Sequence, residues 1–121
     1  MTHKDLIVWQ KGIELVKLLY LHTQSFPKEE LYGLTSQMRR CVVSIPSNIA
    51  EGCGRKSDKE LIQFLYISLG SVSELETQLT ISKELLYLNE ESFNELNDFN
   101  NVVRKMLSAL LNSIKNKPIS Q

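Results

Sequence analysis

The stretch that decides the fold is Ser36-Gln-Met-Arg-Arg-Cys-Val-Val-Ser-Ile-Pro-Ser-Asn-Ile-Ala-Glu-Gly52. Its apolar residues recur every three or four positions, as they do on one face of an amphipathic helix. This inward stripe consists of Met38, Cys41, Val42, Ile45 and Ile49. Pro46 lies in its middle, and an internal proline removes one backbone hydrogen bond and costs about 3 kcal/mol or more. The stretch therefore predicts a helix that is kinked at Pro46.

Short polar side chains surround this proline. We expect them to bond the carbonyls and amides that a kink leaves free, and so to fix the bend. Together with the proline they form a structural motif: Ser44, Pro46, Ser47, Asn48, Glu51 and Gly52. Glu51 has a second interpretation as an acid–base group, but an ion pair with a nearby arginine is the simpler one. Gly52 and Gly54 tolerate left-handed backbone, which predicts the end of the helix, and Thr35 is the expected N-cap.

Working outward, three more amphipathic helices are predicted. One spans about residues 5–23, with further apolar residues beyond its inward stripe, which suggests a second contact such as another subunit. Another begins at a capping box in residues 57–60 and runs to about residue 87, and the last begins at Asn89 as N-cap. The predicted stripes are Leu6, Trp9, Ile13, Val16 and Tyr20; then Leu61, Phe64 or Leu65, Ser68, Val72, Leu75, Leu79 and Leu86; then Leu96, Phe99, Val103, Met106, Leu110 and Ile114.

Four such helices joined by short loops predict an all-α fold, an antiparallel up-down four-helix bundle. We expect a single domain over residues 1–117 and a frayed tail over 118–121. The small residues Ser68, Gly70, Ser71 and Ser73 predict a close approach between helices.

The composition is typical of a globular protein without a membrane segment. Fourteen basic and fourteen acidic residues cancel, so no global field draws the chain to nucleic acid or to an anionic membrane. No apolar run approaches the ~20 residues of a membrane span, and the charged N-terminus argues against a secretory signal. A cytoplasmic location is the expectation. The two cysteines, Cys41 and Cys53, are too far apart on one helix for a disulfide and are interpreted as small hydrophobes.

Motifs that carry chemistry are missing from the sequence. Neither His3 nor His22 follows a glutamate by three residues, as a di-iron bundle requires. There is no phosphate-binding glycine loop, no Cys-x-x-Cys pair and no base beside a serine nucleophile. We therefore expect no catalytic residue, no metal, no cofactor and no small-molecule substrate, and we predict that the protein is not an enzyme.

Charge is unevenly distributed along the chain. Residues 1–59 have a net charge of +3, residues 60–103 of −7 and residues 104–121 of +4. Antiparallel folding would gather lysines and arginines at one end of the bundle, diluted by Asp5, Glu51, Asp58 and Glu60, and glutamates at the other. This pattern suits helix dipoles at solvated ends, and it would also suit a phosphate-binding rim built from several subunits.

Three segments carry a resemblance to a known family: Tyr32-Gly-Leu-Thr-Ser-Gln-Met-Arg-Arg40, Ser44-Ile-Pro-Ser-Asn-Ile-Ala-Glu-Gly52 and Arg55-Lys-Ser57. Here the chain closely resembles the 23S rRNA intervening sequence proteins, which are encoded within bacterial large-subunit ribosomal RNA genes. It is also similar to the accessory variability determinant proteins of diversity-generating retroelements, pentameric bundles that bind nucleic acid and a reverse transcriptase. The resemblance implies a homopentamer of four-helix bundles without established enzymatic activity. Cys41 departs from the alanine expected there.

Two hypotheses for function follow. The first is a non-enzymatic pentameric scaffold that binds RNA, DNA or a nucleoprotein partner, with four candidate contact residues: Arg39, Arg40, Arg55 and Lys56. The second is a protein–protein interaction adaptor that uses an apolar groove or the acidic end and has no nucleic-acid role. Oligomeric mass and the salt dependence of nucleic-acid binding would discriminate between them.

Overall fold

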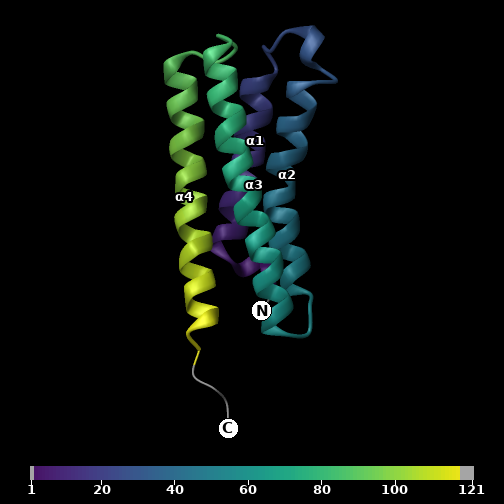
Figure 1. Ribbon diagram of the computed structural model, residues 1–121, viewed down its shortest axis with the longest axis vertical. Helices are drawn as coiled ribbons and strands as arrows, with labels where there is room; N and C mark the ends of the chain where they lie inside the picture. Colours follow the sequence, from purple (N-terminus) through teal and green to yellow (C-terminus); the bar gives the residue numbers. More distant parts are fainter. Residues whose placement is uncertain (1, 118–121) are drawn as a thin grey trace.

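The computed structural model describes residues 2–117 and contains four helices (Figure 1). These are α1 (Ile7–Thr23), α2 (Leu34–Cys53), α3 (Asp58–Glu84) and α4 (Glu90–Lys115), with short 3-10 helices at His3–Asp5 (η1) and Lys28–Glu30 (η2). No strand occurs within these residues. Each helix packs on the next, α4 returns to α1, and neighbours run in opposite directions in Figure 1. The predicted all-α four-helix fold is confirmed; the tail over 118–121 lies outside the described residues.

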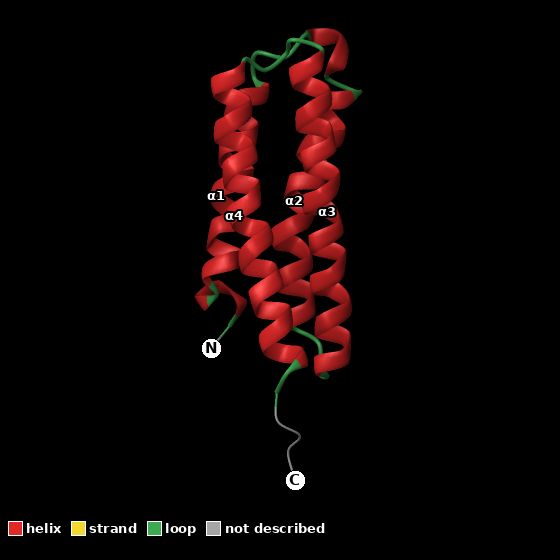
Figure 2. Ribbon diagram, turned by 60° about the vertical axis from the view of Figure 1, so that its left-hand side comes forward, coloured by secondary structure: helices red, strands yellow, loops and turns green. Residues whose placement is uncertain are grey.

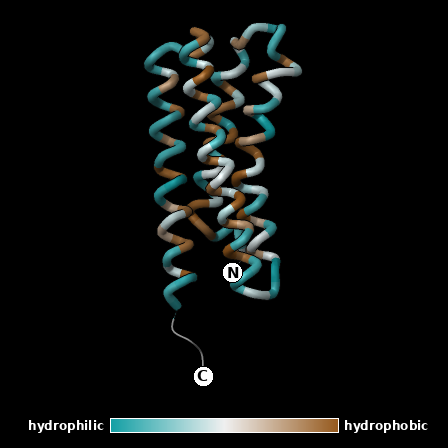
Figure 3. The backbone as a smooth tube through the Cα atoms, viewed as in Figure 1, coloured by the Kyte–Doolittle hydropathy of each residue, from teal (hydrophilic) through white to brown (hydrophobic). Residues whose placement is uncertain are grey.

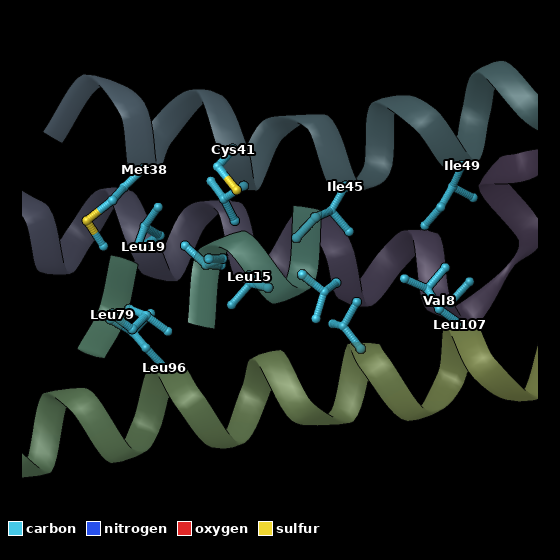
Figure 4. Packing of buried hydrophobic residues seen from close by; sticks show 14 of the residues in the cluster. Val8, Leu15, Leu19, Met38, Cys41, Ile45, Ile49, Leu79, Leu96 and Leu107 are labelled. Carbon is cyan, nitrogen blue, oxygen red and sulfur yellow. The ribbon is translucent and has the colours of Figure 1, made fainter. Parts of the chain in front are cut away.

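One hydrophobic core runs along the bundle between the four helices (Figure 4). The inward stripe of α2 is confirmed, because all five of its predicted members are buried. The stripe predicted for α1 is wrong: Val8, Leu15 and Leu19 are buried, whereas Tyr20 is exposed and the other predicted members are only half-buried. This helix is apolar on most of its circumference, so periodicity alone could not select the face that meets the core.

The stripe predicted for α4 is also partly wrong, by one residue. Leu107 and Leu111 are buried in the core, whereas Met106 and Leu110 are only half-buried. Of the predicted α1 stripe, Trp9, Ile13 and Val16 line a groove between α1 and α2, whereas Leu6 lies with Met106 and Leu110 at the seam between α1 and α4. Except for Ile13, these half-buried side chains still pack against the core.

Two of the three predicted N-caps are confirmed, although the capping box predicted at Ser57 is incomplete, because the Glu60 carboxylate accepts from the Ser57 hydroxyl instead of its backbone N–H. Ser57 and Asn89 are N-caps, and their side chains accept the backbone N–H groups of Glu60 and Ser92 at 3.2 and 2.7 Å. Thr35 is not an N-cap, because α2 begins one residue earlier and its first amide donates to the carboxylate of Glu30 at 3.2 Å. A loop carboxylate that folds back in this way has no short sequence pattern.

The predicted end of α3 is wrong. The helix stops at Glu84, and Leu86 lies outside it with a φ of 64° and 89% exposure, although the stripe predicted it in the core. The N–H of Leu86 donates to the Lys83 carbonyl at 3.0 Å, and the N–H of Tyr87 donates to the Ser82 carbonyl at 2.8 Å. This is a Schellman motif, in which glycine is the usual residue at the position of Leu86.

Gly52 does not end α2 by adopting left-handed backbone. It lies within the helix, and no glycine in residues 2–117 has a positive φ. Instead, a Cβ at Gly52 would lie 2.8 Å from the Cβ of Phe64 and 3.0 Å from the Cδ1 of Leu61. Gly52 thus allows the end of α2 to approach the start of α3. The opposite holds at Gly70, where a Cβ would meet nothing within 4 Å, so the predicted close approach is wrong there.

Candidate functional site

The four candidate nucleic-acid contacts fall into two pairs at different heights on α2. Arg39 and Arg40 lie in the first half of the helix, and Arg55 and Lys56 follow its last residue. At ~1.5 Å per residue, the two pairs are separated by roughly 20 Å along the axis. The structure therefore does not bring these four residues together into one basic cluster.

Arg39 ties α2 to α1. Its Nε donates to the Oγ1 of Thr23 at 3.1 Å, and its guanidinium lies 4.6 Å from the centroid of the Tyr20 ring. Arg40 is exposed and lines a polar groove between α2 and α3. The other residues of this groove are Tyr32, Ser36, Gln37, Cys41, Ser44 and Glu74.

Arg55 and Lys56 lie in the loop between α2 and α3, where both are exposed. Arg55 forms an ion pair with Glu51 at 2.9 Å, and its guanidinium lies 4.8 Å from the centroid of the Phe64 ring. The carboxylate of Glu51 is therefore ion-paired with an arginine, which is the simpler of its two interpretations. These two contacts hold the Arg55 guanidinium at this end of the bundle.

Other lysines lie at the same end, because α1 begins there and α4 ends there (Figure 1). Lys117 forms an ion pair with Asp58 at 3.3 Å, and Lys115 donates to the Tyr66 hydroxyl at 2.8 Å. Lys4 and Lys59 are exposed at this end as well. We call the region formed by Lys4, Arg55, Lys56, Lys59, Lys115 and Lys117 the basic end.

The polar motif around Pro46 joins α2 to α3. Asn48 Nδ2 donates to the Ser44 carbonyl at 2.8 Å, and the Ser44 hydroxyl contacts the Cys41 carbonyl and the Ser71 hydroxyl, the latter at 2.7 Å. From α3, Ser68 donates to the Ile45 carbonyl at 2.8 Å. Ser47 is exposed. Sequence reasoning identified the α2 half of this network but not its serine partners on α3, which lie more than twenty residues away.

The proline itself packs against α1. A Cβ at Gly12 would lie 3.4 Å from the Cβ and 3.5 Å from the Cδ of Pro46, so the two helices meet closely at this point. Pro46 is buried, and α2 continues through it as one helix from Leu34 to Cys53. The role of Gly12 had no signal in the sequence, because a glycine within a helical pattern does not reveal its neighbour.

Cys41 is not an activated nucleophile. Burial, followed by the nearby Glu74 carboxylate, raises the pKa of its thiol to about 12. Its Sγ donates to the Ser71 carbonyl at 3.1 Å. Since the thiolate is the reactive form, Cys41 is chemically inert near neutral pH. Burial also raises the pKa of Cys53, and both thiols are free.

Apolar grooves flank α1 on both sides. The groove between α1 and α2 is lined by apolar and small residues that include Trp9, Ile13, Val43 and Pro46. Two grooves follow the seam between α1 and α4, lined mainly by Leu6, Ile7, Leu18, Leu21, Phe99, Met106 and Leu110. Ile7 and Leu21 are each about 60% exposed. The apolar surface therefore lies on both flanks of α1, whereas its outermost face also carries Gln10, Glu14 and Lys17, the last two at the edge of one groove.

The described part of the chain contains neither a candidate metal site nor a membrane-spanning helix. Residues 2–117 contain no group of three or more His, Cys, Asp or Glu side chains that could hold a metal ion. None of the four helices has the length and apolarity needed to cross a membrane.

Comparison with known proteins assigns the family. The family model described as 23S rRNA-intervening sequence protein matches residues 4–109. The chain belongs to this family. The structure is also similar to a crystal structure from Bacteroides thetaiotaomicron, described as a protein with unknown function from the S23 ribosomal protein family. The TM-score is 0.80 at 24% sequence identity, over 90% of this chain and 98% of the other, so this likeness shows the fold. No curated protein matches the chain significantly.

Proposed function

We propose that this 23S rRNA-intervening sequence protein is a non-enzymatic scaffold that assembles from several copies and binds nucleic acid through its basic end. The resemblance described above implies five copies. The observation that carries the proposal is the apolar surface on both sides of α1. Single-chain soluble proteins rarely expose such an extended apolar surface, and a second copy of the chain would cover it.

The two sides of α1 differ in composition, which suits a ring. A ring forms when one surface of each copy meets a different surface of the next copy and the rotation closes. The open space beside Gly70 on α3 offers a surface that a neighbouring helix could approach closely. In this arrangement α1 would be shared between the core of its own bundle and the contact with the next one.

Assembly would also explain how a chain without net charge could bind nucleic acid. One copy is neutral, but copies arranged with parallel axes would repeat the basic end around one rim. Each copy would contribute Arg55, held by Glu51 and Phe64, and the exposed Lys56. Phosphate neutralisation at such a rim releases counterions, so binding must weaken as salt rises. Arg39 and Arg40 lie away from this rim and are the weaker candidates, since Arg39 already bonds Thr23.

Light scattering tests the assembly. We expect a mass five times the 13.9 kDa of one chain. Leu21→Glu would place a charge in the groove beside α1 and should dissociate the assembly while helical circular dichroism is retained. The control is Asn94→Glu, which places the same charge at an exposed position of α4 that lines none of these grooves, and it should leave the mass unchanged. A monomeric mass for the unmodified protein would refute the proposal.

Fluorescence anisotropy with a labelled single-stranded RNA, at 50–300 mM salt, tests the rim. Arg55→Gln/Lys56→Gln should weaken binding and reduce the salt slope. The chain offers a matched control in Arg104→Gln/Lys105→Gln, which removes an equal charge from the middle of α4, where the arginine is likewise ion-paired, to Glu76 at 3.3 Å. Equal losses for the two double variants, or salt-independent binding, would contradict a phosphate-binding rim.

A further inference from the structure

Leu86 occupies a backbone conformation that leucine rarely adopts. Its φ of 64° is in the left-handed region, where the Cβ of an L-residue is crowded and glycine is normally found. Its side chain is nevertheless 89% exposed, so it packs against almost nothing in the bundle. A glycine at this position would relieve the crowding and lose no contact of note. Within one copy of the protein, the leucine has no structural benefit.

Further apolar side chains are exposed beside it. The loop before α2 carries Leu31 and Tyr32, which are 49% and 94% exposed, and Leu85 is 50% exposed. Both loops lie at the same end of the bundle (Figure 2). We call the exposed set Leu31, Tyr32, Leu85 and Leu86 the leucine end; its tip on α3 is coloured as hydrophobic in Figure 3.

The two loops are held together by Tyr87. Its hydroxyl donates to the Oε2 of Glu30 at 2.9 Å, and its ring lies 5.4 Å from that of Phe26. Glu30 in turn accepts the first amide of α2. The loops that carry the exposed leucines are thus held in place by hydrogen bonds to Glu30. Leu31 also lines a hollow of about 260 Å³ between the end of α1 and η2, together with Phe26 and Pro27.

Carboxylates surround the leucine end. Residues 24–33 and 83–91 contain five glutamates, at positions 29, 30, 84, 90 and 91, against two lysines, Lys28 and Lys83. This charge repels phosphate, so neither nucleic acid nor an anionic lipid surface fits here. It attracts a partner that carries lysine or arginine beside apolar side chains.

We propose that the leucine end is a docking surface for a cationic amphipathic helix of a partner protein, whose apolar face contacts Leu86 and its neighbours and whose basic residues face the glutamates. Helices of this kind bind by laying an apolar face onto an apolar surface. The site lies at the end opposite Arg55 and Lys56 and does not depend on nucleic-acid binding. It gives the adaptor hypothesis a surface and a partner of defined chemistry.

The probe is an 18-residue fluorescein-labelled helical peptide of leucine and lysine, compared by anisotropy with a serine and lysine peptide of equal charge. Leu86→Gly removes the side chain and keeps the backbone conformation. Loss of one buried leucine contact should weaken binding of the leucine peptide roughly tenfold to a hundredfold. The melting temperature should stay equal or rise. Val102→Ala, which trims another exposed apolar side chain, should leave the affinity unchanged.

Several results would overturn the proposal. One is absence of binding by the leucine peptide, and another is equally tight binding of the serine peptide, which would show that charge alone suffices. Unchanged affinity in Leu86→Gly would remove the leucine from the site. If light scattering showed that Leu86→Gly reduces self-association, the surface would belong to a second copy of this chain instead of a partner.

Discussion

Replacing Gly52 by alanine tests the closest helix approach in the bundle. The new Cβ would lie 2.8 Å from the Cβ of Phe64, whereas carbon atoms pack best at about 3.5–4.0 Å. Both Cβ atoms are fixed by their backbones, so rotation of a side chain cannot relieve the contact. The end of α2 must therefore move away from the start of α3.

The size of the effect follows from two opposing terms. Overpacking a tight contact costs about 1–3 kcal/mol, whereas alanine in place of glycine favours the helix by up to about 1 kcal/mol. Because neither Cβ can rotate away, the overpacking cost should lie in the upper part of its range, so we expect a net loss of about 1–2 kcal/mol in the free energy of unfolding. For a chain of this length, that loss corresponds to a melting temperature lower by roughly 3–8 °C.

Thermal and urea unfolding followed by circular dichroism, at one protein concentration, would measure this loss. The matched control is Gly54→Ala, two residues further on. A Cβ there would lie 3.6 Å from its nearest neighbour, the Glu51 carbonyl oxygen, and φ is −83°. We expect its stability to change by no more than about 0.5 kcal/mol. A Gly52→Ala variant as stable as the original protein would refute the close approach of α2 and α3.

Three further predictions concern other contacts. Gly70→Ala should stabilise an isolated bundle by up to about 1 kcal/mol, because its Cβ meets nothing, yet weaken assembly if a neighbouring copy packs there; urea unfolding and light scattering would separate the two effects. Ser68→Ala should cost about 1 kcal/mol through loss of its hydrogen bond to α2, whereas Ser47→Ala, at an exposed position, should be neutral in the same unfolding assay. Cys41 should resist iodoacetamide at pH 8 and begin to react only as the pH approaches its raised pKa of about 12, with modification followed by mass spectrometry; rapid alkylation of the folded protein at pH 8 would contradict this.

The pattern of apolar residues predicted the helices well where each helix has one apolar face. On α2, the polar and apolar sides are distinct, and all five predicted core residues are buried. On α1, apolar residues occur all around, and the face was assigned wrongly. The ambiguity has a physical origin: α1 packs against both α2 and α4, so its apolar residues extend over more than one side of the helix.

Local rules also failed where a contact joins distant parts of the chain. The N-terminus of α2 is capped by Glu30, and Gly33 makes room for it, since a Cβ there would lie 2.8 Å from the carboxylate oxygen. Gly12 and Gly52 likewise permit contacts with Pro46 and Phe64 that no local pattern reveals. Such glycines are meaningful only once the neighbouring helix is known.

The position of the basic residues in the sequence likewise did not reveal which of them lie together in the structure. The candidate arginines and lysine all lie near a recognisable motif, yet they form two separate groups. One group lies in the first half of α2 and the other follows its last residue. Arg39 is occupied by Thr23 and the Tyr20 ring, whereas Arg55 is oriented toward the basic end by Glu51 and Phe64. The two proposals place nucleic acid at the basic end and a cationic helix at the leucine end of one neutral chain. Variants at Lys56 and Leu86 should therefore affect different partners, and their effects should be additive because the sites share no contact.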